Sequence, residues 1–537
     1  MSISFQDLKK INHSNIYFFL LIILSVALPL SKYVMSLSQI LLLLNWLIEG
    51  NFNKKLQILK TRKSIILLVS IIIIHFIWLI PSHDIKYGLD DIRIKMPLLI
   101  LPLIIGTSKP LNQLQIKKIL MFFIVSVTFA SIICTFVFLG LTKHVITNYR
   151  DISIFISHIR FALLINVAIF CLVYFLISKI YIISKFEKYI YVILILWLTG
   201  FLFILNSSTG IVVLLITSYI LIFYYTIHLK KLLLRILFIF LLILFPTFLI
   251  IQVTNSVLKY YTIENINFNN LENYTIQGNK YYHNKSSRLI ENGHYIWLYV
   301  CEKELNTEWN KISDYNYGGK DLLGQDIRLT LIRYLASLGY KKDAEGIKKL
   351  KKEDVRAIED GYSNFIFKNK YSIYPLIYKI IWEIDIYNKT RDANAHTLTQ
   401  RIEFLKTANY IIKDNFWFGV STGDLQLKFN QYYNKLHSSL IKEYRLRAHN
   451  QFVTFFITFG IFGFIYILFA LVYPIILEKK YNNYYFIVFL IIAILSMLNE
   501  DTIETQAGAT FFAFFYCIFL FSEKPAEINN KATYLNK

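Results

Sequence analysis

The sequence predicts an all-α polytopic membrane protein with about twelve transmembrane helices and a large, mainly helical loop domain between the ninth and the tenth. The first observation is composition: hydrophobic residues make up 55% of the 537 residues, and charged residues only 17%. The second is that apolar runs of roughly 20 residues, long enough to cross a bilayer as a helix, recur along the chain. A soluble chain does not need such runs. The predicted spans are 15–31, 33–49, 64–80, 94–107, 119–140, 159–178, 188–206, 209–227, 232–253, 450–476, 484–499 and 507–522.

These spans predict three regions. An N-terminal membrane region covers 1–253, the loop domain covers 254–448, and a C-terminal membrane region with a cytoplasmic tail covers 449–537. The fourth span is the weakest of the twelve, because Arg93 and Lys95 stand at its start. The first two spans are joined so closely that they can form one kinked hairpin.

The charge distribution predicts the orientation. The formal net charge is +22, and with the N-terminus inside, the cytoplasmic segments hold roughly twenty Lys and Arg against about six in the short outer loops. This asymmetry predicts that both termini lie in the cytoplasm and that the loop domain lies outside, which is the periplasm if the membrane is the inner membrane of a Gram-negative bacterium. The same asymmetry explains the positive net charge without a nucleic-acid partner. The predicted spans exclude a soluble, nucleic-acid-binding role.

Disulfide, metal and cofactor chemistry have no support in the sequence. Three of the four cysteines (Cys134, Cys171, Cys301 and Cys517) lie in apolar runs, which leaves Cys301 without an obvious partner. Neither a CxxC nor an HExxH pattern occurs, so we predict no metal site and no cofactor. The first apolar run lacks a small-residue cleavage site and is predicted to be a retained span.

The loop domain carries helical patterns. Apolar residues recur near every 3.6 positions at 329–340, 343–361 and 401–415. In the last segment the pattern places five residues toward a packed side: Ile402, Leu405, Ala408, Tyr410 and Ile412.

Basic residues gather where water meets lipid on the outer face. Arg160 stands at the end of the sixth span, Arg401 begins a loop helix, and Arg445, Arg447 and His449 crowd the entrance to the tenth span. The planar guanidinium suits pyrophosphate oxygens, and a histidine can act as a general base toward a sugar hydroxyl. Together these residues could bind a lipid diphosphate and activate an acceptor.

Each of these residues also has a structural interpretation. Arg445 and Arg447 can be snorkelling anchors, and Arg160 can form a salt bridge to Asp151 or to another outer-loop acid. A lone histidine at an interface is more often structural than catalytic. The SSTG segment at 207–210 fits a tight turn. The acidic segment 499–506 fits either a solvated loop or the lining of a site.

The segment 385–475 resembles the O-antigen ligase/polymerase superfamily of bacterial membrane glycosyltransferases, and the span count, topology and large outer loop extend the resemblance to the whole chain. The resemblance lies in the Arg401 helix, the FGVSTGD turn at 418–424, the RAHNQF entry to a span at 447–452, and the GIFG glycines at 460–463. Segments such as GHYIWLYVCEKELNTEWNK and LNEDTIETQAGATFFAFF look like the Bacteroidetes branch of that family.

The resemblance implies a metal-independent, inverting glycosyltransferase that acts in the membrane. Its donor would be a glycan on undecaprenyl diphosphate, and its acceptor lipid A–core or another glycan. O-antigen ligase is the preferred function, ahead of O-antigen polymerase or protein O-glycan ligase. A lipid-linked sugar transporter ranks last, because no paired halves are evident and the ionisable residues sit at the outer edge.

The resemblance also assigns residues. His449 and Arg401 fall on the family's loop histidine and loop-helix arginine, and we expect both to be catalytic together with Arg160. Ser208 stands where a second family arginine is expected, and Arg160 and Arg288 are its possible substitutes. Asn450 would orient His449 or the acceptor. The predicted substrate-binding residues are Arg288, Arg445, Arg447, Asn450 and Ser208.

Overall fold

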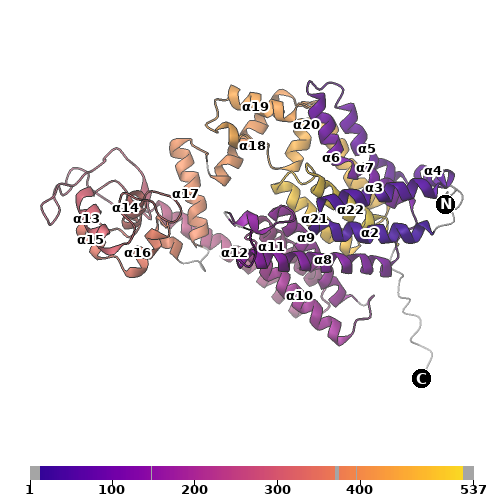
Figure 1. Cartoon of the computed structure of the whole chain (residues 1–537), viewed down its shortest axis with the longest axis horizontal. Coiled ribbons are helices and arrows are strands. Elements are labelled where there is room, and N and C mark those ends of the chain that lie inside the picture. Colours follow the sequence, from indigo (N-terminus) through magenta and orange to yellow (C-terminus); the bar gives the residue numbers. More distant parts are fainter. Residues whose placement is uncertain are drawn as a thin grey trace. The chain divides into compact units, whose positions relative to one another are not determined.

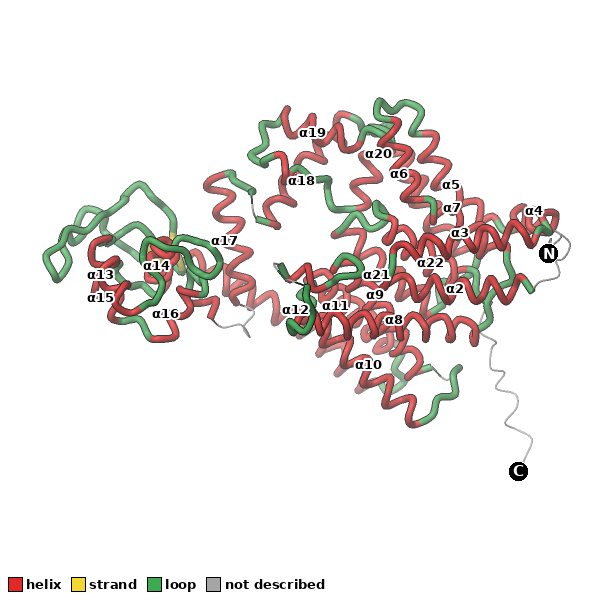
Figure 2. Tube along the Cα trace, in the orientation of Figure 1, coloured by secondary structure: helices red, strands yellow, loops and turns green. Residues whose placement is uncertain are grey.

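The computed structural model describes residues 12–523 except 145, 147, 179, 369–373 and 395. In this part of the chain the regular structure is helical apart from one short sheet of two strands (Figures 1 and 2). The chain divides into two compact units, one formed by Met1–Tyr225 with Gln400–Lys537 and the other by Thr226–Thr399. The segment 400–448, predicted as part of the loop domain, therefore belongs to the first unit.

The first unit contains most of the apolar helices. Its N-terminal helices are α2 (His13–Leu30), α3 (Lys32–Glu49), α4 (Phe52–Thr61), α5 (Lys63–Ile77), α6 (Ile85–Lys95), α7 (Pro97–Thr107), α8 (Gln113–Phe138), η1 (Tyr149–Ile152), α9 (His158–Ile177), α10 (Lys185–Ile204) and α11 (Ser208–Ile227). Its later helices are α18 (Thr397–Asp414), α19 (Leu425–Lys435), η3 (Lys442–Tyr444), α20 (Gln451–Leu477), α21 (Tyr484–Asn499) and α22 (Gln506–Leu520).

The helix lengths confirm an all-α polytopic membrane protein. Among the described residues, seven helices are long and apolar enough to cross a membrane, and the α3–α4 pair, bent by 109°, would make eight. Three further apolar helices, α5, α21 and α22, are shorter. The predicted fourth span coincides with α7, which has 11 residues and rises only about 16 Å, roughly half of a hydrocarbon core. Lys95, at the end of α6, precedes it.

The membrane helices from the two ends of the chain are packed together. In the first unit α20 packs on α5, α22 on α7, and α21 on α9, while α2 packs between α3 and α8. Their shared apolar core includes Leu21, Phe123, Leu164 and Phe515. The three C-terminal spans are therefore held by helices made much earlier in the chain, which fixes the loop between α21 and α22.

A break in α20 explains the glycines of the two segments 418–424 and 460–463. Gly460 has φ +65, outside the helical range, so the carbonyls before it lose their donors within the helix. The amides of Val420 and Ser421 replace them by donating to Ile457 and Thr458, at 2.8 and 3.1 Å. Non-helical backbone at membrane depth needs such partners.

The two backbones approach closely at this break. A Cβ on Gly460 would lie 2.3 Å from the Trp417 oxygen, and one on Gly419, where φ is +72, would lie 2.4 Å from the Thr458 oxygen. Only glycine fits both places. The loop 415–424 is also tied to the end of α5, because Thr422 donates to Trp78 through its amide and to His75 through its hydroxyl.

The second unit contains α12 and a small helical domain. Its elements are α12 (Leu232–Tyr261), β1 (Ile290–Glu291), β2 (His294–Tyr295), α13 (Glu302–Ile312), α14 (Ile327–Ser337), α15 (Ala344–Lys348), α16 (Lys352–Glu359), η2 (Phe365–Lys368) and α17 (Tyr374–Thr390). The antiparallel strands pair Ile290 with Tyr295 and Glu291 with His294. Trp309, Tyr334 and Leu335 are fully buried in the core beside them. The pattern at 343–361 predicts one helix, whereas the structure has the two short helices α15 and α16.

The predicted packed face of α18 is wrong for three of its five residues. Ile402, Leu405 and Tyr410 are exposed, whereas Ala408 is buried as predicted and Ile412 is half-buried; the buried stripe consists of Phe404, Ala408 and Ile411. Apolar residues lie on both sides of this helix, so periodicity alone does not identify the side that packs. The stripe that packs brings Phe404 beside His449, with ring centroids 5.7 Å apart.

Candidate functional site

Arg401 and His449 meet at one carboxylate, that of Glu500. Arg401 Nη2 lies 2.9 Å from Glu500 Oε1, and His449 Nδ1 lies 3.4 Å from Glu500 Oε2. Arg401 belongs to α18, His449 directly precedes the cap of α20, and Glu500 follows α21. Packing within the first unit thus joins three residues that are far apart in the sequence.

The loop before α22 holds Arg401 at a second point. Arg401 Nη1 donates to the Asn499 carbonyl oxygen at 3.0 Å and also to the Asn499 side-chain oxygen. The Asn499 amide donates to Thr209 Oγ1 at 2.8 Å. Thr209 follows Ser208, the first residue of α11, so the SSTG segment borders the site through Thr209, whereas Ser208 itself is exposed.

His449 has an unusual backbone conformation. Its φ is +49, a left-handed value that costs energy in a residue with a side chain, and such residues gather at functional sites. The next residue, Asn450, caps α20: its side-chain oxygen accepts from the amides of Phe452 and Val453, both at 3.1 Å. The Asn450 amide donates to the Leu498 carbonyl. Asn450 thus fixes the helix start that places His449.

Arg160 adds a second guanidinium near the same carboxylate. Its Nη1 donates to Ser157 Oγ at 3.0 Å, and its buried Nε has no hydrogen-bond partner among the described residues. A buried donor without a partner costs about 1–3 kcal/mol. An anionic oxygen would satisfy it.

The local charges keep Glu500 ionised. Burial pushes the pKa of Glu500 upward, but its hydrogen bond to His449 and the positive charges of Arg401 and Arg160 outweigh burial and lower the pKa below its ordinary value. Arg401 and Arg160 both act on Glu500, Arg160 also faces Asp501, and the buried Nε of Arg160 is left without a partner among the described residues. Such a cluster can hold a further anion.

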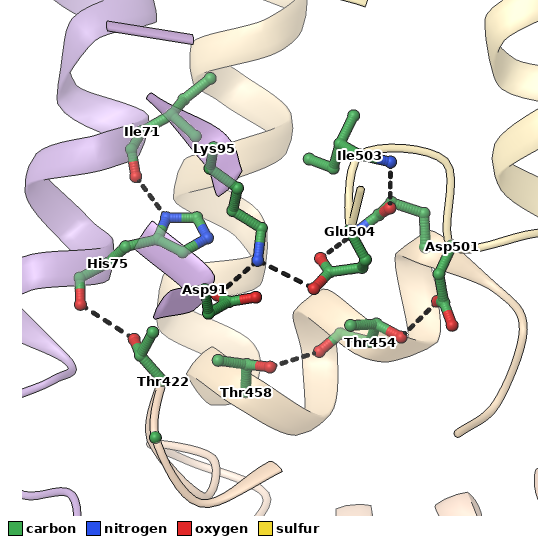
Figure 3. Close-up of polar contacts among 12 residues, drawn as sticks. Ile71, His75, Asp91, Lys95, Thr422, Thr454, Thr458, Asp501, Ile503 and Glu504 are labelled. Carbon is green, nitrogen blue, oxygen red and sulfur yellow. Dashed lines mark hydrogen bonds and ion pairs between the residues drawn. The ribbon is translucent and has the colours of Figure 1, made fainter. Parts of the chain in front are cut away.

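A buried ion network lies next to this cluster (Figure 3). Lys95 Nζ contacts Asp91 and, at 2.8 Å, Glu504 Oε2, and Arg447 Nη1 lies 3.1 Å from the same Glu504 oxygen. Gln451 Nε2 donates to the other Glu504 oxygen at 2.9 Å. Two cations and an amide thus hold Glu504, which is 3% exposed.

The same network fixes the loop that carries Glu500. Gln451 accepts from the Ile503 amide at 2.9 Å, and Thr454 Oγ1 donates to Asp501 Oδ1 at 2.7 Å (Figure 3). Gln451 and Thr454 lie on the first turns of α20. The loop between α21 and α22 is therefore held at three residues that directly follow Glu500, which lets this side chain position Arg401 and His449.

Residues 358–468 match the family model described as O-antigen ligase. This part of the chain is therefore similar to the O-antigen ligase family. The matched range contains Arg401, His449 and the broken part of α20, whereas Glu500 and Arg160 lie outside it. Among curated proteins, none matches the chain.

The remaining predicted arginines, Arg445, Arg447 and Arg288, have contacts with other groups. Arg445 donates to the Leu440 carbonyl and to the side-chain oxygen of Asn434, and both contacts lie within its own loop. Arg447 is taken up by Glu504. Arg288 lies in the second unit, with its guanidinium 5.3 Å from the Phe268 ring centre.

Glu500 and Asn499 are the site residues that sequence reasoning did not select. The available signal was the acidic segment 499–506 at the end of a span, which fits a site lining as well as a solvated loop. No group of three or more His, Cys, Asp or Glu side chains that could hold a metal ion occurs within the described ranges.

Proposed function

We propose that this protein is a membrane glycosyltransferase that moves a glycan from a polyprenyl diphosphate, by family undecaprenyl diphosphate, to an acceptor hydroxyl. The observation that carries the proposal is the Glu500 carboxylate with Arg401 on one oxygen and His449 on the other. The similarity of residues 358–468 to the O-antigen ligase family supports the same chemistry. By the distribution of charge, the site lies at the periplasmic face of the inner membrane and both termini lie in the cytoplasm.

Arg401 and Arg160 bind the diphosphate. A guanidinium donates two parallel hydrogen bonds to phosphate oxygens, and the unpaired Nε of Arg160 gains a partner when the donor binds. The same two charges stabilise the diphosphate as it leaves with its negative charge. Arg401 keeps its contact with Asn499 and turns part of its fork from Glu500 to the phosphate.

His449 acts as the general base. A carboxylate facing Nδ1 favours the tautomer with the proton on Nδ1, which leaves Nε2 free to accept the proton of the acceptor hydroxyl. The acceptor oxygen forms its bond to the anomeric carbon as the bond from that carbon to the diphosphate oxygen breaks. The proton passes to His449, the configuration inverts, and Glu500 stabilises the imidazolium. No metal or cofactor takes part in this scheme.

The test changes His449 to Ala. In a transfer assay with purified lipid-linked donor, we expect the variant to lose most activity, because general-base catalysis contributes about 10²–10⁴-fold. The matched control is His144→Ala, since His144 is exposed in an outer loop. Full transfer by a correctly inserted His449→Ala protein would remove the general base from the proposal.

The acceptor distinguishes the ligase from its alternatives. We place O-antigen ligase, with lipid A–core as the acceptor, ahead of a polymerase or a protein O-glycan ligase. In a strain that lacks this protein, polymer accumulating on its lipid carrier beside free core indicates the ligase. Core capped by a single repeat unit indicates the polymerase, and normal lipopolysaccharide with unglycosylated protein indicates the protein ligase.

A further inference from the structure

The second unit contains a pocket lined by two tryptophans. Its volume is about 420 Å³, and it lies between the β1 region, α14 and α17, with Trp297 and Trp382 in its wall. Pockets that bind small ligands have volumes of about 300–1,000 Å³ and combine apolar walls with a few polar groups. All of its lining residues belong to one compact unit.

Both indole rings keep an unused polar group. Trp297 and Trp382 are half-buried, and within the described part of the chain neither indole N–H donates a hydrogen bond. A half-buried tryptophan usually finds a partner for this group, and its ring face is electron-rich. Such a ring attracts the weakly positive C–H groups of a ligand while its N–H is ready to donate.

Some polar groups that line the pocket are hydrogen-bonded within the protein, and others have no hydrogen-bond partner among the described residues. Arg333 donates through Nε to the buried Glu291 at 2.7 Å and lies 5.3 Å from the Trp382 ring centre, which fixes both side chains. Among the described residues, Nη1 of Arg333, Oδ2 of Asp326 and the side-chain amide of Gln325 have no hydrogen-bond partner. Donors and acceptors therefore surround the aromatic walls.

The charge balance excludes a phosphate as the ligand. The positive charge of Arg333 is matched by Glu291, and Asp326 adds a further carboxylate whose other oxygen accepts from Lys320. The pocket is thus not cationic. A wholly apolar ligand would leave the polar rim unpaired, at a cost.

We infer that this pocket binds a saccharide, which presents C–H faces to the two tryptophans and hydroxyl groups to Arg333, Asp326 and Gln325. The inference rests on the proposed function for the source of the saccharide, the glycan being transferred. Under this inference the second unit recognises the saccharide.

The experiment measures binding directly with the full chain in lipid nanodiscs. The probe is the oligosaccharide released by mild acid from the lipid-linked glycan of the source strain, titrated by calorimetry. We expect binding by the wild type and a loss of about tenfold or more for Trp382→Ala and Trp297→Ala. Trp382→Phe should keep part of the affinity. Tyr274→Ala is the matched control, because Tyr274 is a 63% exposed aromatic of the same unit.

Several outcomes overturn the inference. It fails if the wild type does not bind the oligosaccharide, if folded Trp297→Ala and Trp382→Phe both bind as well as wild type, or if inorganic pyrophosphate competes for the pocket. The His449→Ala variant distinguishes failure of the saccharide pocket from failure of the proposed function. If that variant keeps full transfer while the tryptophan variants lose binding, the catalytic proposal fails and the saccharide pocket stands. If it loses transfer while the tryptophan variants bind normally, only the pocket fails.

Discussion

Replacing Glu500 by Gln tests the central contact with almost no change of shape. The substitution removes the charge that faces His449 Nδ1 at 3.4 Å and Arg401 Nη2 at 2.9 Å. At an effective dielectric constant of about 20, two unit charges 3.4 Å apart interact by about 5 kcal/mol. The side chain of His449 is 31% exposed and that of Glu500 is 14% exposed. Solvent screening therefore reduces the interaction energy, and we take about half of the 5 kcal/mol.

The expected result is a large loss in kcat. About 2–3 kcal/mol less stabilisation of the imidazolium corresponds to a fall of roughly 30- to 150-fold. KM for the donor should not rise, because Arg401 is released from a competing carboxylate. The assay is steady-state transfer from purified lipid-linked donor. Glu443→Gln is the control, since Glu443 is exposed in η3. A kcat within twofold of wild type for Glu500→Gln would refute the reasoning.

Three further predictions follow from the same geometry. Arg401→Lys should lower kcat/KM by about 10–100-fold, because an ammonium cannot reproduce the fork that contacts Asn499 and Glu500; near-normal transfer would show that a point charge suffices. Burial alone would raise the pKa of Glu504, but Lys95 and Arg447 lower it far below its ordinary 4.5. Its stabilising contribution is therefore fully present above pH 4.5 and is lost as the pH falls through the lower folded value. Glu504→Gln should lose about 3–5 kcal/mol of stability at pH 7 and show a flatter decline in melting temperature below pH 4.5; an unchanged acid profile would contradict this. Gly460→Ala should destabilise the protein by more than about 2 kcal/mol, because φ is positive and the Trp417 oxygen lies 2.3 Å from the new Cβ. Gly140→Ala isolates the cost of positive φ, since nothing lies within 4 Å of its Cβ. Equal melting temperatures for the two alanine variants would argue against the clash.

The membrane helices were predictable because apolar run length is a local property. The predicted range 450–476 coincides with α20 at Gln451–Leu477, and 484–499 coincides with α21. The fourth range gave a short helix because Lys95, next to its start, is held in the buried network by Asp91 and Glu504. The charged Lys95 inside the predicted fourth span thus marked a range in which the length of the apolar run overestimated the helix.

The site was predictable only in part, because its contacts join distant segments. His449 and Arg401 were selected by resemblance, but their shared partner Glu500 follows them by 51 and 99 residues. Packing of α18, α20 and α21 decides that contact. Arg447 was predicted to bind substrate from its position beside His449. The buried Glu504 that takes it up cannot be told from a solvated acid in the sequence.

The break in α20 also bears on how the protein is assembled in the membrane. The carbonyls of Ile457 and Thr458 enter the bilayer without donors from their own helix, and the amides that complete them belong to residues 420 and 421. Those residues leave the ribosome first, as do Trp78 and His75, to which Thr422 is fastened. The last three spans therefore insert against segments that are synthesised earlier and that supply these hydrogen-bond donors. A C-terminal fragment expressed alone would lack the donors for the Ile457 and Thr458 carbonyls.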